Sequence, residues 1–223
     1  IFVKQLKNHK PIHYIIGQRD FYGYDFLVDE HVLIPRSDTE ILVENAVNLL
    51  KNKKKNLKGL EIGVGSGIIS ITLLKKLKNL SMTAVDINDY AIDISKKNAE
   101  NLRVADRLKL IKSDLFENVK GKYDFIISNP PYIDEKDMSS LPEKVKNYEP
   151  CSALDGRKNG MYFYDEIIKN GRAFLDDNFH IFFEIGYNQG DMIKQSFANF
   201  GYEKDVKIIQ DYGKNDRVAI YGE

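Results

Sequence analysis

The residues best suited to chemistry stand in the stretch SNPPYI, residues 128–133, which directly follows the apolar run YDFII. The side-chain oxygen of Asn129 accepts hydrogen bonds, and the carbonyl of Pro130 is a second acceptor that the pair Pro130–Pro131 holds in a fixed direction. Tyr132 adds a flat aromatic face beside them. These groups suit a planar partner that carries an NH2, such as a carboxamide or the exocyclic amine of a base.

A nitrogen of this kind is a poor nucleophile because its lone pair is delocalised into the adjoining π system. Two acceptors that bind its hydrogens raise the electron density on nitrogen and stabilise the positive charge that develops as it attacks a methyl group. The stretch NPPY therefore predicts methyl transfer by positioning and fixed dipoles, without a strong base. The alternative interpretation is a rigid strand exit with no chemistry.

A second candidate site is EIGVGSG, residues 61–67, between a predicted strand and a predicted helix. A glycine-rich loop binds a nucleotide in this context, because glycines permit a tight turn and a close approach of the ligand to the backbone. The helix that follows favours an anionic group at its N-terminus. The loop residues expected to hold the ligand are Gly63, Val64, Gly65, Ser66 and Gly67.

Two acidic residues follow later strands. Asp86 comes after SMTAV and can accept both ribose hydroxyls of an adenine nucleoside, although it can also be the N-cap of the next helix. Asp114, in KSDLF, can receive an adenine amino group while Leu115 packs on the ring, and a lone acid there is also typical of a turn. The loop and the acids indicate a nucleotide cofactor but leave NAD and S-adenosylmethionine both open.

Alternating strands and helices must position these residues. The predicted strands are 57–63, 81–86, 107–114, 122–129, 180–186, 205–212 and 216–223, and the predicted helices are 67–78, 89–102, 161–175 and 189–200. In the helix 67–78, apolar residues fall near one face, as in an amphipathic helix: Ile68, Ile71, Leu74 and Leu77. The alternation predicts an α/β fold, a Rossmann-like, seven-stranded, mainly parallel sheet with helices on both faces. The ligand then lies beyond the C-terminal ends of the strands.

The N-terminal part predicts a hairpin and a helix. Residues 12–34 alternate around YGYD and predict a β-hairpin, and Ser37 with Glu40 forms a predicted capping box for a helix that runs to about Lys51. We interpret the basic stretch 51–58 as a solvated linker. Because the chain opens on Ile1 inside a predicted helix, we expect that a further segment precedes it.

Composition narrows the class of protein. Lys+Arg and Asp+Glu both number 33, so the net charge is zero and no basic field points to nucleic acid. No apolar run approaches the roughly 18 residues of a membrane span. One cysteine, Cys151, fits a reducing compartment and has no recognisable nucleophile setting. The histidines at 9, 13, 31 and 180 show no ligand spacing, so no metal site is predicted.

Six stretches, in order and over nearly the whole chain, resemble the HemK/PrmC family: PIHYIIGQRDFYGYDFLVDEHVLIPRSDTEILVE, LEIGVGSGIISI, SNPPYI, YEPCSALDGRKNGMYFY, FFEIGYNQ and GKNDRVAIY. The resemblance implies a class I methyltransferase that uses S-adenosyl-L-methionine and releases S-adenosyl-L-homocysteine. Its acceptor would be the side-chain amide of the glutamine in the Gly-Gly-Gln loop of peptide chain release factors. The family's IPRPETE is IPRSDTE here, with Ser37 and Asp38 as departures, and Glu61 stands where the family often has aspartate.

The resemblance also implies roles for matching residues. The loop 63–67 would hold the methionine part of the cofactor, Asp86 the ribose, and Leu115 the adenine. Asn129, also next to the cofactor, and the Pro130 carbonyl would bind the glutamine amide. The remaining residues implied near the crevice are Pro131, Tyr132 and Phe21 beside the substrate, with Arg36 and Thr39 around it. Glu184, in FFEIG, ends a predicted strand near the crevice and is either an acceptor behind the site or only a cap. The long segment 133–159, which contains Glu149 and Pro150, is interpreted as a lid.

The same resemblance divides the chain into three parts. Residues 1–11 would end a helical N-terminal domain, 12–36 would form a hairpin linker, and 37–223 would be the catalytic domain. The implied enzyme is cytoplasmic and has a release factor as its protein partner. It would contact no membrane, and nucleic acid only indirectly through the translation machinery.

Other functions stay open at this point. An adenine amino-methyltransferase acting on DNA or RNA would grip its planar amine in the same way, and a methyltransferase for a ribosomal-protein glutamine would share the chemistry. In a Rossmann oxidoreductase, or in a nucleotide-binding module without catalysis, the NPPY stretch would occur by chance and have no role in methyl transfer. Binding of S-adenosylhomocysteine argues against this last class, whereas a spectral change with nicotinamide cofactors favours it.

Overall fold

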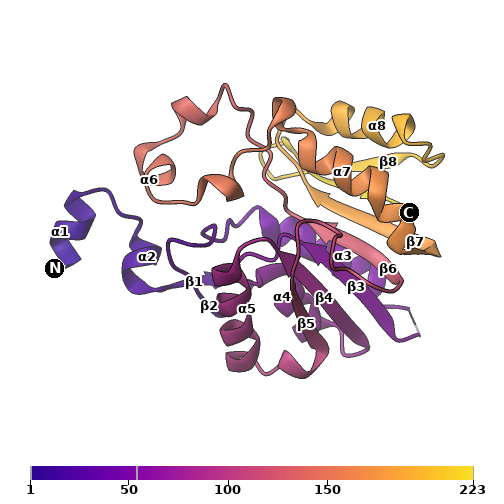
Figure 1. Cartoon of the computed structure of the whole chain (residues 1–223), viewed down its shortest axis with the longest axis horizontal. Coiled ribbons are helices and arrows are strands. Elements are labelled where there is room, and N and C mark those ends of the chain that lie inside the picture. The colour runs from indigo at the N-terminus through magenta and orange to yellow at the C-terminus, as the bar shows by residue number, and fades with distance from the viewer. Residues whose placement is uncertain (1, 54, 223) are drawn as a thin grey trace.

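A seven-stranded sheet forms the centre of the computed structural model, which describes residues 2–53 and 55–222 (Figure 1). The order of the strands across the sheet is β5-β4-β3-β6-β7-β9-β8. Their bounds are β3 Leu57–Ile62, β4 Leu80–Asp86, β5 Leu108–Lys112, β6 Tyr123–Ser128, β7 Leu175–Glu184, β8 Val206–Gln210 and β9 Asp216–Tyr221. A separate two-stranded sheet pairs β1 (Gln18–Phe21) with β2 (Tyr24–Leu27).

The path of the chain through the sheet creates a place for a ligand. Each neighbouring pair from β5 to β7 is parallel, and β9 runs antiparallel to both β7 and β8. The chain enters the sheet at β3, moves outward to β5, then returns to β6 on the other side of β3. The order therefore reverses between β3 and β6, where open α/β sheets bind ligands. The predicted seven-stranded, mainly parallel sheet is confirmed.

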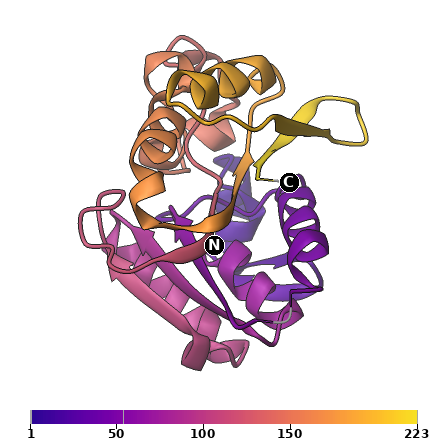
Figure 2. The same ribbon diagram turned by 90° about the vertical axis from the view of Figure 1, so that its right-hand side faces the viewer.

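Helices cover both faces of this sheet. Their bounds are α1 Phe2–Lys7, α2 Ile12–Ile16, α3 Thr39–Leu50, α4 Ile68–Lys76, α5 Asp89–Asn101, α6 Glu143–Lys146, α7 Tyr162–Gly171 and α8 Gly190–Asn199. Short 3-10 turns span Ala105–Arg107, Met138–Ser140, Cys151–Ala153, Lys158–Gly160 and Arg172–Phe174. Helices α3 and α4 share one core with the sheet, and α7 and α8 share the other, so the purple and the orange-to-yellow helices separate in Figure 2. Consecutive residues of β6 alternate between the two cores, since Phe125 and Ile127 join the first and Ile126 the second.

Helix α4 is buried more completely than its predicted amphipathic pattern implies. Every residue from Ile68 to Leu74 is buried, including Ile69 and Leu73, which lie off the predicted apolar face. The reason is that α4 contacts α3, α5 and β4 at once. The helix directly behind the glycine-rich loop is therefore held on all sides.

The N-terminal hairpin is shorter than predicted. Its paired strands occupy only residues 18–27, and Ile12–Ile16 forms the helix α2 instead of a strand. Pro11 precedes that helix, and Gly17 ends it in the left-handed conformation at φ 80°, which glycine adopts without strain. A five-residue apolar run fits either kind of element, and the two flanking residues explain why it is a helix here.

The predicted capping box of Ser37 and Glu40 is wrong. Helix α3 begins at Thr39, and its N-cap residue, Asp38, makes no side-chain capping hydrogen bond. The carboxylate of Glu40 instead accepts a hydrogen bond of 2.9 Å from the backbone N–H of Tyr22 in the hairpin. A tertiary contact between the hairpin and α3 replaces the local cap.

The segment from 133 to 160 contains α6 and three of the 3-10 turns, and a parallel bridge between Ile133 and Asp155 ties its two ends together. Figure 1 shows it on the same side of the molecule as α2, and the Tyr148 hydroxyl donates to the carbonyl of Asn8. Across residues 2–53 and 55–222, no helix has the length and apolar character needed to cross a membrane.

Candidate functional site

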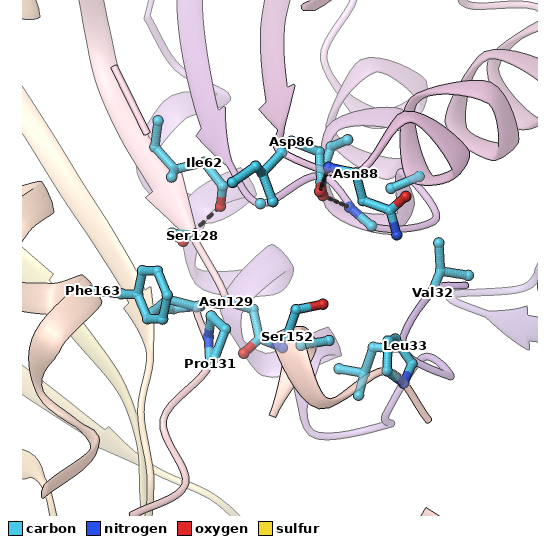
Figure 3. A pocket seen from close by; sticks show the side chains of 18 of the residues that line it. Val32, Leu33, Ile62, Asp86, Asn88, Ser128, Asn129, Pro131, Ser152 and Phe163 are labelled. Atoms are coloured by element: carbon cyan, nitrogen blue, oxygen red, sulfur yellow. Dashed lines mark hydrogen bonds between the residues drawn. The ribbon is translucent and has the colours of Figure 1, made fainter. Parts of the chain in front are cut away.

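A cavity of about 380 Å³ lies at the C-terminal ends of β3, β4 and β6, where the strand order reverses. Six stretches of the chain contribute residues to its walls: 31–39, 61–69, 85–91, 113–115, 128–131 and 150–167. Figure 3 shows Asp86 and Asn88 on one side of this space and Asn129, Pro131 and Ser152 on the other. The structure thus brings the glycine-rich loop, the predicted acids and most of NPPY around one cavity.

The glycine-rich loop turns between β3 and α4 with its backbone amides fixed. Gly63 and Gly65 adopt φ values of 78° and 53°, which explains why both positions require glycine. The N–H groups of Gly63 and Val64 both donate to the carbonyl of Val85, at 2.9 and 3.0 Å. Gly67, at the end of the loop, does not line the cavity. It is the N-cap residue of α4, at φ 86°, and a side chain there would meet Ile71 at 2.7 Å.

Helix α5 holds this loop from behind. The Ser95 hydroxyl donates to the Gly65 carbonyl at 2.9 Å, and the Asn98 amide donates to the Ser66 carbonyl at 2.8 Å. Asn98 also accepts from the backbone N–H of Leu27 and donates to its carbonyl, so one buried side chain joins the hairpin to the loop. The loop backbone therefore cannot move into the cavity without breaking these bonds.

Asp86 ends β4 and lines the cavity, as predicted. One carboxylate oxygen accepts from the Gly65 N–H and the other from the Asn88 N–H, each at 2.9 Å. The N-cap of α5 is Asn88, whose side chain accepts from Tyr90, so the alternative N-cap role for Asp86 is wrong. Burial raises the pKa of Asp86, and these backbone hydrogen bonds oppose the rise. The carboxylate is thus oriented by backbone N–H groups at a position on the cavity wall.

Asp114 and Leu115 also line the cavity, just after β5. The Ser113 hydroxyl donates to the carbonyl of Leu115 at 3.1 Å, and Leu115 itself has a φ of 45°, in the left-handed region that leucine rarely adopts. This bond stabilises a turn that places both residues on the wall. His31, which stacks on Tyr90 with ring centroids 4.1 Å apart, borders the cavity as well.

Glu61 is a buried acid on the cavity wall. Its Oε2 accepts from the backbone N–H of Ser70 at 3.0 Å and from the Ser70 hydroxyl. Its Oε1 is buried with no hydrogen-bond partner among the described residues. Burial raises the pKa of Glu61 to about 8, while the bonds from Ser70 oppose the rise. The cavity thus contains an unsatisfied acceptor suited to a cationic or hydrogen-bond-donating group.

The stretch NPPY begins where β6 ends. The Ser128 hydroxyl donates to the Ile62 carbonyl of the neighbouring strand at 2.7 Å, which fixes the strand end (Figure 3). Asn129, Pro130 and Pro131 then line the cavity. The Asn129 amide donates to the Thr39 hydroxyl at 3.4 Å, so the side-chain oxygen is the part of Asn129 left to accept from a ligand.

Two residues predicted beside the substrate lie outside the cavity lining. Tyr132 packs against the core beneath α7, where burial raises the pKa of its hydroxyl to about 12, and its carbonyl accepts from Gln189 at 3.2 Å. Phe21 is 1% exposed and packs edge-to-face on Phe26 with centroids 6.1 Å apart. The position of Phe21 is that of a core residue, because the pleat of β1 turns it inward.

The segment 133–160 supplies wall residues that sequence reasoning missed, among them Pro150, Cys151 and Ser152. It is attached near the cavity by Glu149, whose carboxylate lies 2.5 Å from the Arg36 guanidinium. The Glu149 side chain is only 1% exposed, so this ion pair is shielded on one side. Within the described ranges, no group of three or more His, Cys, Asp and Glu side chains could hold a metal ion.

Comparison with known proteins places this geometry in context. The family model described as "Methyltransferase small domain" matches residues 37–144. A release factor glutamine methyltransferase of Fusobacterium nucleatum is 42% identical over 223 residues, and the alignment covers 99% of this chain and 62% of that relative. One of Streptococcus pneumoniae is 43% identical, with 97% of this chain and 77% of the relative covered. The crystal structure of a release-factor-specific protein-(glutamine-N5) methyltransferase from Alicyclobacillus acidocaldarius superposes with a TM-score of 0.52 at 25% identity, covering 84% of this chain and 92% of that one.

Proposed function

The chain belongs to the family of release factor glutamine methyltransferases, and from this premise we propose that it methylates a glutamine side-chain amide in the Gly-Gly-Gln loop of peptide chain release factors. The methyl donor would be S-adenosyl-L-methionine. The observation that carries the proposal is that Asn129 and Pro130 line the same cavity as the glycine-rich loop and Asp86. Figure 3 shows Asn129 and Asp86 on opposite sides of it. A methyl donor and a planar amide can therefore meet across one space.

The residues on the cavity wall fit this donor. The Asp86 carboxylate on the wall suits the ribose hydroxyls, and Asp114 and Leu115 suit the adenine. The unpaired Oε1 of Glu61 suits the ammonium group of the methionine part, since a buried carboxylate oxygen without a partner favours a cationic donor. When bound, S-adenosyl-L-methionine supplies a methyl group carried on a positively charged sulfur.

The chain's own residues would activate the acceptor. The Asn129 side-chain oxygen and the Pro130 carbonyl each accept one N–H of the substrate amide, which orients the nitrogen lone pair toward the donor. The same two dipoles stabilise the positive charge that grows on nitrogen during the reaction. Because the amide nitrogen is acidic once methylated, its extra proton passes to water, and no strong base in the protein is needed.

The proposal is tested with labelled S-adenosyl-L-methionine and three acceptors: an intact release factor, the same factor with its loop glutamine changed to alanine, and duplex DNA. We expect label on the intact factor alone, at a glutamine identified by mass spectrometry. Label on the alanine variant would place the methyl group elsewhere on the protein. Label on DNA would assign the chain to adenine methylation instead.

A further inference from the structure

Glu184 is a buried acid close to Asn129 that the mechanism above does not use. It is the last residue of β7, whose Phe183 pairs in register with Ser128 of β6, so Glu184 and Asn129 leave adjacent strands side by side. Its side chain is almost fully buried and does not line the cavity. Glu184 is therefore placed to contact Asn129 without contacting a ligand.

Hydrogen bonds connect the two residues through helix α3. The Asn129 amide donates to the Thr39 hydroxyl at 3.4 Å. Thr39 and Asn129 also act on Glu184, since hydrogen bonding from both side chains lowers the pKa of its carboxyl, while its Oε2 is buried without a hydrogen-bond partner among the described residues. Thr39 is the first residue of α3 and is fully buried. The backbone carbonyl of Glu184 accepts from the Tyr164 hydroxyl at 2.8 Å, which fixes the end of β7.

The direction of these hydrogen bonds follows from the chemistry of the carboxylate. An ionised carboxylate only accepts, so the Thr39 proton points to Glu184 and the Thr39 oxygen is left to accept from Asn129. Asn129 must then present its NH2 to this buried side and its oxygen to the cavity. Without the carboxylate, the amide of Asn129 could turn over and offer its NH2 to the substrate NH2, where two donors would face each other.

We propose that Glu184, acting through Thr39, is a positioning residue that fixes which end of the Asn129 amide faces the acceptor nitrogen. The inference deepens the proposed function and rests on it for its kinetic consequences. Its structural content, the orientation of one side-chain amide, does not depend on which acceptor is methylated. Glu184 touches neither cavity nor donor, so its effect on the reaction is carried entirely by Asn129.

The charge of Glu184 makes this positioning sensitive to pH. Burial raises the pKa of Glu184 to about 7, and the Thr39 hydrogen bond and the positive charge of Arg217 on β9 oppose the rise. Asp38, before α3, raises the pKa further, and the Tyr132 hydroxyl lies near the same carboxylate. Protonated Glu184 can donate a hydrogen bond, so the direction of the hydrogen bonds from Asn129 through Thr39 to Glu184 is no longer fixed. We therefore expect turnover to fall as the pH drops below about 7.

The kinetic test compares Glu184→Gln with Glu203→Gln, an exposed glutamate used as the matched control. The loss of one charge-assisted hydrogen bond predicts a fall in kcat of about 10- to 100-fold for Glu184→Gln, with unchanged affinity for S-adenosylhomocysteine. The acid limb of its kcat profile near pH 7 should disappear. Thr39→Ser retains the hydroxyl and should restore the parental kcat and acid limb. Thr39→Val lacks the hydroxyl and should show a lowered kcat without the acid limb. Parental kcat and an unchanged acid limb in Glu184→Gln would overturn the proposal.

A second measurement needs no methyl transfer. In nitrogen-15 spectra, the side-chain NH2 signal of Asn129, identified by its loss in Asn129→Asp, should shift with a midpoint near pH 7. The shift should vanish in Glu184→Gln and persist in Glu203→Gln. An Asn129 signal that does not titrate in the parental chain refutes the positioning role. If the signal titrates but no acceptor is labelled, the positioning stands and the proposed function fails.

Discussion

Asp86 offers the sharpest test of the cofactor site because its carboxylate has two separable tasks. It already accepts backbone N–H groups, among them those of Gly65 and Asn88, and it lines the cavity, where it would also accept the ribose hydroxyls. In Asp86→Ala both sets of hydrogen bonds are lost. The variant should therefore bind S-adenosylhomocysteine more weakly for two reasons, namely missing ribose contacts and a loosened loop.

The size of the effect follows from these contacts. A hydrogen bond to a charged group contributes about 1.5–3 kcal/mol, so two ribose contacts amount to about 3–6 kcal/mol. Each 1.4 kcal/mol is roughly tenfold in affinity, which predicts a rise in Kd of about 10²- to 10⁴-fold. Because the fold already partly buries this carboxylate, further desolvation on binding offsets only part of the gain. The Kd of Asp86→Asn should lie between those of the parental protein and Asp86→Ala, since the NH2 of the asparagine must face one of the two backbone N–H groups.

Isothermal titration calorimetry with S-adenosylhomocysteine measures these differences directly. The matched control is Asp89→Asn, three residues along, where an exposed carboxylate forms an ion pair with Lys112 and does not line the cavity. Its Kd should stay within about threefold of the parental value, because exposed ion pairs contribute little. A similarly small change in Asp86→Ala, in a variant with native circular dichroism, would refute the ribose role.

Three further perturbations test other parts of the site. Asn129→Ala should lower single-turnover methyl transfer by about 10²- to 10³-fold while calorimetry shows unchanged S-adenosylhomocysteine binding, and unchanged turnover would exclude it as an acceptor. Glu61 has its pKa raised from 4.5 to about 8, so its contribution to stability is complete below pH 4.5 and is lost as the pH rises toward 8. Glu61→Gln should therefore flatten that decline in urea unfolding, and an equally steep decline would contradict its burial as the cause. Arg36→Ala leaves the buried Glu149 carboxylate without its cation and should lower the opening free energy of residues 133–159 by about 1–3 kcal/mol in hydrogen exchange. Equal protection in the variant would show that other contacts hold the segment.

Most of the fold could be predicted because its signals are local and repeated. Buried strands such as FIIS in β6 and the alternation with helices define a parallel sheet, and the sheet then places loop, Asp86 and Asn129 at one edge. The errors occur where a short signal competes with a distant contact. Ile12–Ile16 is too short for its period to decide, and Glu40 is bonded to Tyr22 in the hairpin.

The side chains that hold the site from behind could not be predicted either, because their partners are distant in the sequence. Asn98 appears in the sequence as one polar residue of a helix, yet its partners are Leu27 and Ser66, far away along the chain. The direction of a side chain is equally hidden, since Tyr132 directly follows the cavity residues Pro130 and Pro131 but packs against the core and does not line the cavity. Long-range partners and side-chain directions emerge only when the strands are in register.

The reversal of strand order between β3 and β6 has a consequence for how such a protein can change over evolutionary time. The residues proposed to hold the donor lie before position 116, on the β3-β4-β5 half of the sheet. Asn129 and Pro130 directly follow β6, on the half of the sheet that runs from β6 to β8. Thr39 is an exception, because it precedes β3 in the chain but contacts Asn129. The residues proposed to bind the methyl donor and those proposed to bind the acceptor are thus encoded largely in two consecutive segments of the gene. In the sheet, the two segments are adjacent where β3 pairs with β6. Substitutions or insertions after β6 can redirect the acceptor while the inherited donor half stays intact.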